Sequence, residues 1–127
     1  MSLLGQEYYG KRIIAAKYDK STIYLLLEDG CIAIDDRQSC CETRYFHTED
    51  NLQDLVGHRL AKIEVKCGGN GPAPAPRWPR DYVREISFLE IQAGHETVTF
   101  TAYNIHNGYY GSCNIEVEET EWSDKDG

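Results

Sequence analysis

The residues best suited to chemistry lie near the C-terminus, in the run from Tyr103 to Gly111. This run combines turn-forming Asn and Gly with one imidazole and three phenols. Asn and Gly alone are typical of a tight turn. Rings that stack, beside amides and an imidazole that hydrogen-bond, are typical of a site for a planar polar ligand. The candidate ligand-binding residues in this run are Asn104, His106, Asn107, Tyr109 and Tyr110.

The same run has a plainer interpretation as a hairpin turn. Its Asn side chains would then satisfy the backbone, and its Tyr rings would cover the edge of the core. In the ligand-binding interpretation, a nucleotide-like or other planar polar ligand lies between the Tyr rings, while Asn and His contact its polar edge. The residues alone leave both interpretations open.

A second polar cluster, Cys40-Cys41-Glu42-Thr43-Arg44-Tyr45, lies in the first half of the chain. The forked guanidinium of Arg44 is suited to a phosphate on the ligand. A reactive cysteine would need a positive neighbour, which Arg44 or His47 could supply. Adjacent side chains on a strand point to opposite faces, so ligand contact or a structural role is the simpler interpretation. The candidate ligand-binding residues of this cluster are Cys41, Glu42, Arg44 and Tyr45.

The His and Cys residues do not form a metal-binding motif. The four His residues are scattered, and the five Cys residues include no CxxC pair. An odd number of Cys without paired spacing also argues against a disulfide framework or a zinc finger. We therefore expect no metal, no cofactor and reduced thiols, with Cys31 and Cys113 as small buried side chains on strands.

Charge and composition restrict the partners. The chain has 127 residues and a net charge of −8, from 21 acidic and 13 basic residues. Direct binding to DNA or RNA is therefore unfavourable, because it relies on Lys and Arg to displace counterions. The apolar runs are too short for a membrane span and no secretory signal is visible, so we expect a cytoplasmic location. The acidic tail, residues 119–127, is expected to be a strand end followed by a solvated terminus.

Strand patterns dominate the elements that must position these residues. Alternating or β-branched runs predict strands over 11–17, 22–28, 31–34, 59–66, 83–92, 96–103 and 113–118. Asp29-Gly30 predicts a type I′ hairpin turn, which needs positive φ at both central residues. One short helix is predicted from Asp50, which forms a capping box with Gln53, to Gly57 at its end.

The chain is predicted to form one domain, residues 1–127. Residues 68–80 are rich in Gly and Pro and predict a long loop inside that domain. The predicted fold class is mainly β, a β-rich α+β fold. It consists of an antiparallel sheet of about six or seven strands, either curved or forming a small sandwich, with one short helix.

These motifs resemble those of a large family of small proteins of unknown function, encoded mainly by phages and prophages. Its pattern includes Cys-Cys-Glu-x-Arg-Tyr, here Cys40 to Tyr45, and His-Asn-x-His-Asn-Gly-Tyr-Tyr-Gly-Gly, here Tyr103 to Ser112. The other matching segments are Leu3-Leu4-Gly5, Glu49 to Gly57 and Glu85 to Ile91. Tyr103 replaces the first His of the C-terminal motif and Ser112 its last Gly. The loss of that His argues further against a metal site.

The resemblance implies an accessory protein of a phage or prophage that acts inside the host cell. Counter-defence is a frequent purpose of such proteins. Thoeris anti-defence sponges are small β-rich proteins that sequester a cyclic-nucleotide-derived signal without cleaving it. This chain is similar to them in size and β content.

We therefore expect a non-enzymatic binding protein that acts in counter-defence by sequestering a small phosphorylated or nucleotide-derived ligand. Arg44 would contact the phosphate and the Tyr rings would stack. The alternative is an acidic inhibitor that binds a basic site on a host defence protein through Glu116, Glu118, Glu119 and Glu121. A third alternative is a small hydrolase with Glu42 or His106 as general base. Homo-oligomerisation through a sheet edge is left open.

Overall fold

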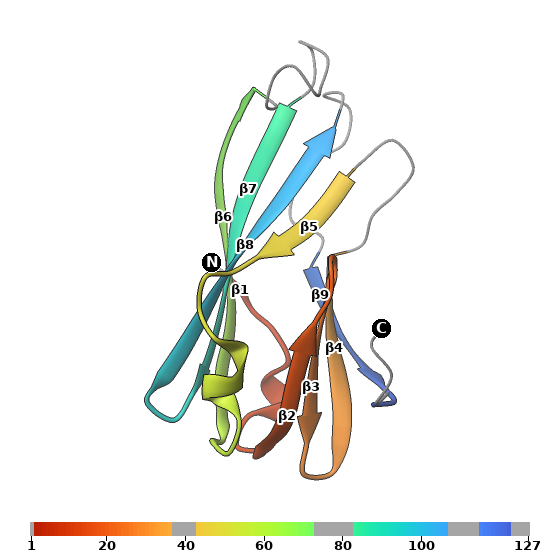
Figure 1. Ribbon diagram of the computed structural model, residues 1–127, viewed down its shortest axis with the longest axis vertical. Coiled ribbons are helices and arrows are strands. Elements are labelled where there is room, and N and C mark those ends of the chain that lie inside the picture. The colour runs from red at the N-terminus through yellow and green to blue at the C-terminus, as the bar shows by residue number, and fades with distance from the viewer. Residues whose placement is uncertain (1, 37–42, 73–82, 107–114, 123–127) are drawn as a thin grey trace.

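The computed structural model describes residues 2–36, 43–72, 83–106 and 115–122, and its strands form two antiparallel sheets (Figure 1). One sheet has five strands in the order β1-β6-β7-β8-β5, and the other has four in the order β2-β3-β4-β9. The strands of the first sheet are β1 (Ser2–Leu3), β5 (Thr43–His47), β6 (Leu60–Pro72), β7 (Val83–Ala93) and β8 (Glu96–His106). Those of the second are β2 (Ile13–Tyr18), β3 (Thr22–Leu27), β4 (Gly30–Asp36) and β9 (Ile115–Thr120).

The mainly β, antiparallel character predicted from the sequence is confirmed, but the arrangement of the strands differs. The sequence predicts an antiparallel sheet of about six or seven strands, curved or forming a small sandwich, whereas the strands form two separate sheets of five and four strands. An alternating pattern shows that one face of a strand is buried, but not which element covers that face. In Figure 1, β2, β3 and β4 lie beside the lower half of the longer sheet, whose strands continue past them.

One hydrophobic core is shared by the two sheets. Inward side chains of both sheets, such as Ile23 of β3 and Ile91 of β7, belong to a single buried cluster. Phe100 of β8 is fully buried at its centre. Its ring contacts Tyr18 of β2 and Phe46 of β5 edge-on, with centroids 5.0 and 5.8 Å apart. Phe100 therefore joins strands of both sheets.

The predicted hairpin between β3 and β4 is present, but its turn is shifted by one residue. Leu27 pairs with Gly30, so the central residues are Glu28 and Asp29 rather than Asp29 and Gly30. Gly30 begins β4 and has no positive φ. The register of a hairpin follows from which residues face the core, and here it overrides the turn preference of the Asp-Gly pair.

The predicted helix that begins at Asp50 is wrong. Two 3₁₀ turns are the helical elements of the described residues, η1 (Gln6–Tyr8) and η2 (Leu52–Leu55). Asn51, not Asp50, caps η2, because its side chain accepts the backbone N–H of Gln53. Asp50 instead accepts the backbone N–H of Thr99 at 2.9 Å. A segment this short cannot repay the cost of starting an α-helix.

Two long strands extend past their predicted ends. β6 continues through Gly68 to Pro72, into the segment predicted as a loop over 68–80. A Cβ at Gly68 would lie 2.5 Å from the carbonyl oxygen of Ile86, so glycine permits this close approach of the two backbones. β8 continues to His106, into the predicted turn that begins at Tyr103. The remaining parts of both predicted segments, 73–80 and 107–111, lie outside the described residues.

The acidic C-terminal segment begins as a strand, as predicted, and the structure places this strand at the edge of a sheet. β9 ends the order of the four-stranded sheet and pairs with β4. After β9, the ring of Trp122 lies over Lys17 of β2, whose Nζ is 4.6 Å from the ring centroid. The rest of the tail, 123–127, lies outside the described residues. No helix in the part of the chain that the structure describes has the length and apolar character needed to cross a membrane.

Candidate functional site

Two predicted site residues from distant parts of the sequence are cross-strand neighbours. Arg44 on β5 pairs with Asn104 on β8, and His106 follows two residues later. Arg44 and Asn104 are 4% exposed and His106 is 3% exposed. Their side chains share the inner face with the core residues Phe46 and Ala102, because alternate residues of a strand point to one side. The structure thus brings these three predicted residues together at one end of the core.

This inner cluster contains its own counter-charges. Nη1 of Arg44 donates a hydrogen bond to Oδ1 of Asp36 on β4 at 2.8 Å. Nε2 of His106 lies 3.1 Å from Oε1 of Glu85 on β7, within ion-pair distance although the geometry is not that of a hydrogen bond. Buried charges are stable only when they are paired. We therefore interpret the inner cluster as a polar bridge between the two sheets.

Tyr45, predicted to join the same site, lies on the opposite face of the five-stranded sheet. It alternates with Arg44 and so points outward, where it stacks on Tyr103 of β8. The two ring centroids are 4.9 Å apart and the rings are inclined by 22°. The guanidinium carbon of Arg84 on β7 lies 5.9 Å from the centroid of the Tyr103 ring. The sheet therefore separates Tyr45 from the inner cluster.

A shallow hollow of about 350 Å³ lies beside these rings on the outer face. Its lining residues are Tyr45, Phe46, His47, Arg84 and Tyr103. Nε of Arg84 is buried and has no hydrogen-bond acceptor in the described part of the chain. The outer hollow thus combines aromatic rings with a forked cation, the combination that the sequence predicted around Arg44.

Sequence reasoning missed Arg84, although part of the signal was present. The alternation of the predicted strand over 83–92 places Arg84, Ile86 and Phe88 on one face. Only the pairing of β7 with β8, in which Ile86 is opposite Tyr103, brings Arg84 close to the Tyr103 ring. Register between strands is a long-range property, so no local pattern could have assigned this neighbour.

The other predicted site residues, Cys41, Glu42, Asn107, Tyr109 and Tyr110, lie outside the described residues. In the chain, the first two precede β5 and the other three follow β8. Over the four described ranges, no three or more His, Cys, Asp or Glu side chains are grouped so that they could hold a metal ion.

Residues 6–115, which include both polar motifs, match DUF7448, a domain of unknown function. The chain belongs to the DUF7448 family. The expectation that it belongs to a family of unknown function is thereby confirmed. No curated protein and no solved structure matches the chain. The DUF7448 match ends at the first residue of β9, so the inner cluster and the outer hollow both belong to this domain.

Proposed function

We propose that this DUF7448 protein is a non-enzymatic binding protein that sequesters a small nucleotide-derived ligand with a phosphate group in the outer hollow. The proposal rests on the position of the Arg84 side chain. Its guanidinium lies over the Tyr103 ring, and its buried Nε has no acceptor among the described residues. An anionic oxygen would satisfy this donor, and hydrogen bonds between a guanidinium and a phosphate are stronger than neutral ones.

The aromatic pair Tyr45 and Tyr103 supports the other part of the proposal, that the ligand carries a nucleotide base. Tyr45 and Tyr103 are both only partly buried, so a planar ring can lie against them. Stacking on an aromatic side chain contributes about 1–3 kcal/mol per base. A volume of about 350 Å³ lies at the small end of ligand sites. The net charge of −8 opposes a long polyanion, so a ligand of mononucleotide size is favoured over a nucleic acid.

This proposal moves the phosphate contact from Arg44 to Arg84. Arg44 is 4% exposed and its Nη1 is hydrogen-bonded to Asp36 at 2.8 Å, so a phosphate could contact it only if the inner cluster opened. The inner cluster would instead position the binding residues. Because Tyr45 and Tyr103 alternate along their strands with Arg44 and Asn104, a rigid inner face holds the outer rings in register.

We further propose that the ligand is a host defence signal and that the protein is a phage or prophage accessory protein acting in the host cytoplasm. The two motifs Cys40 to Tyr45 and Tyr103 to Ser112, which resemble those of phage-encoded proteins, support this context. A sponge would act by lowering the free concentration of the signal, which requires tight binding and no catalytic step.

Native mass spectrometry of the protein purified from a bacterial host tests sequestration directly. We expect the native mass to exceed the denatured mass by that of a small molecule, which denaturation releases. The Arg84→Met variant is expected to lose this molecule. Arg59→Met is the matched control, because Arg59 is an exposed arginine that contacts Gly10 and Glu28 and does not line the outer hollow.

Calorimetric titration with AMP and with adenosine separates phosphate binding from stacking. We expect AMP to bind more tightly than adenosine and Arg84→Met to remove that difference. Tyr45→Ala should weaken the binding of both compounds by about tenfold or more. The proposal is wrong if no small molecule co-purifies and neither compound binds at about 10 mM.

The edge strand β9 favours a second candidate function, the binding of a basic site on a host protein. β9 ends its sheet, and its glutamates are exposed. Such an interaction weakens as salt increases. Pull-downs from host lysate should therefore capture a partner at low salt, and less of it when Glu116, Glu118, Glu119 and Glu121 are all changed to Gln. Equal capture of the partner by the parent and by the fourfold Gln variant at every salt concentration would exclude this function.

A further inference from the structure

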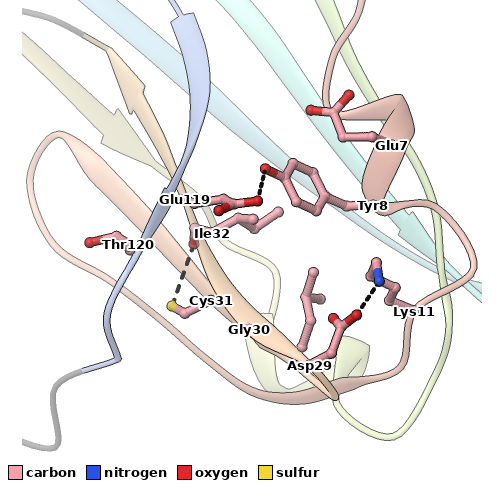
Figure 2. A pocket seen from close by; sticks show the side chains of 10 residues that line it. Glu7, Tyr8, Lys11, Asp29, Gly30, Cys31, Ile32, Glu119 and Thr120 are labelled. Atoms are coloured by element: carbon pink, nitrogen blue, oxygen red, sulfur yellow. Dashed lines mark hydrogen bonds and ion pairs between the residues drawn. The ribbon is translucent and has the colours of Figure 1, made fainter.

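A second cavity, of about 370 Å³, lies beneath the end of β9 and shares no residue with the outer hollow (Figure 2). Its walls come from η1, the β3–β4 hairpin and β9. Leu27, Cys31 and Ile32 contribute an apolar lining, and all three are buried. The polar lining includes Glu7 and Tyr8 of η1 and Glu119 of β9. An apolar surface with a few charged groups at its rim is typical of a small-molecule site.

The strand register directs Glu119 toward this cavity. Glu119 pairs with Ile32 of β4, and Val117, two residues earlier, packs against the core. Glu119 thus lies on the inner side of its strand, unlike the glutamates that alternate with it. The hydroxyl of Tyr8 donates to Oε1 of Glu119 at 3.2 Å, and Figure 2 shows the two side chains facing each other.

The position of η1 depends on Gly5. Its φ of +63° is in the left-handed region that favours glycine. A Cβ at Gly5 would lie 3.4 Å from Cδ1 of Ile63 and 3.5 Å from Cγ1 of Val117, so this residue packs between the two sheets. The N-terminal segment is thereby held against both sheets, with Tyr8 above β9.

The cavity is negatively charged. Lys11 is the only Lys or Arg among its described lining residues, and it pairs with Asp29. The carboxylates of Glu7 and Glu119 have no cationic partner in the described part of the chain. The pKa of Tyr8 is raised above its usual value, most strongly by partial burial. The negative charge of Glu119 and its hydrogen bond to Tyr8 raise it further, and the charge of Glu7 adds the smallest increase. Its hydroxyl therefore stays protonated and remains a donor to Glu119.

We propose that this cavity binds an organic cation, with an ammonium or guanidinium group against Glu119 and Glu7 and an apolar stem against Leu27, Cys31 and Ile32. The carboxylates supply the charge complement, and the Tyr8 ring supplies a surface that attracts cations. The buried apolar lining selects a cation with a hydrocarbon stem over a hydrated inorganic ion. The cation could belong to a free polyamine-like molecule or to an Arg or Lys side chain of a protein.

An NMR titration of the ¹⁵N-labelled protein with agmatine tests this proposal. We expect shifts of the Tyr8, Gly30 and Glu119 amides and a dissociation constant that rises with salt. Butanol, which has the stem but no charge, is expected to bind at least about tenfold more weakly. Titration with N-acetyl-arginine amide distinguishes the two sources: binding of agmatine alone indicates a free small molecule, and binding of both indicates a protein side chain.

Substitutions make the test specific to the cavity. Glu119→Gln should weaken agmatine binding by about tenfold or more, whereas Glu121→Gln, an exposed glutamate outside the cavity, should not. Gly30→Lys places a cation at the rim, where a Cβ meets nothing within 4 Å, and should block binding without disturbing the core. All three variants should bind AMP in the outer hollow as the parent protein does. The proposal is wrong if neither cation binds at about 10 mM or if Glu119→Gln binds agmatine as the parent does.

Discussion

The guanidinium of Arg44 and the carboxylate of Asp36 form an ion pair that joins the two sheets. Nη1 and Oδ1 are 2.8 Å apart, and the side chains are 4% and 3% exposed. Asp36 is the last residue of β4 and Arg44 lies near the start of β5. The pair thus holds together the ends of two strands that are consecutive in the chain but belong to different sheets.

Removing one member of this pair should be far more costly than removing an exposed one. We expect Asp36→Ala to lower the free energy of unfolding by about 3–5 kcal/mol, because it removes the carboxylate that is hydrogen-bonded to the buried Arg44 guanidinium. Glu28→Ala, which breaks an exposed pair with Arg59, should cost about 1 kcal/mol or less. Urea denaturation measures both. Equal costs would show that the buried pair contributes no more to stability than an exposed one.

Two phenylalanines on the five-stranded sheet should differ sharply in how much they contribute to the free energy of unfolding. Phe100 is fully buried between Tyr18 and Phe46, whereas Phe88 is 41% exposed. Phe100→Ala should lower the free energy of unfolding by about 3–5 kcal/mol, because it removes buried area and leaves a cavity. Phe88→Ala should change it by roughly 1 kcal/mol or less. The measurement is chemical denaturation followed by tryptophan fluorescence; similar losses would contradict the assigned core.

Gly94 is expected to resist substitution, in contrast to Gly30. Gly94 has a φ of +60° in the β7–β8 turn, and a Cβ there would lie 2.7 Å from Nδ1 of His58. Because His58 is exposed and can move, we assign most of the cost of Gly94→Ala to the backbone, about 1–3 kcal/mol. Gly30→Ala meets nothing within 4 Å and needs no left-handed conformation, so it should be nearly neutral. Thermal unfolding compares the two, and a destabilised Gly30→Ala would contradict the shifted turn.

The thiol of Cys31 should be unreactive and should make stability fall at alkaline pH. Burial raises the pKa of Cys31, and Lys17 lowers it by less. Since the folded chain favours the protonated thiol, the raised pKa of Cys31 contributes to stability. This contribution is fully present below the unfolded-state pKa. It is lost as the pH rises through the higher folded-state value. We expect Cys31→Ala to remove part of the alkaline loss of stability that the parent shows.

Alkylation provides an independent check on Cys31. Iodoacetamide reacts with the thiolate, so the native protein should be modified at Cys31 more slowly than the urea-unfolded chain at the same pH. Peptide-resolved mass spectrometry separates Cys31 from the other cysteines. Equal rates in the folded and unfolded chains would show that the thiol is accessible and its pKa unperturbed.

Much of the local structure follows from the sequence, because alternation and turn chemistry act over a few residues. The strands around Ile63, Leu89 and Val98 were predicted from their apolar spacing, and the β7–β8 turn from Gly94. The burial of Cys31 was also predicted. The helix prediction failed at Asp50, whose carboxylate is bound to the backbone of Thr99, a contact that no local pattern reveals.

The sequence by itself predicted that Arg44, Asn104 and His106 lie near each other, and the structure places them together. Only the tertiary structure decided that these residues face the core, while Tyr45 faces outward beside Arg84. The physical reason is that a strand has two faces, and its own sequence does not specify which element covers each one. The pairing of β5 with β8 and the docking of the second sheet made one face a buried bridge and left the other open.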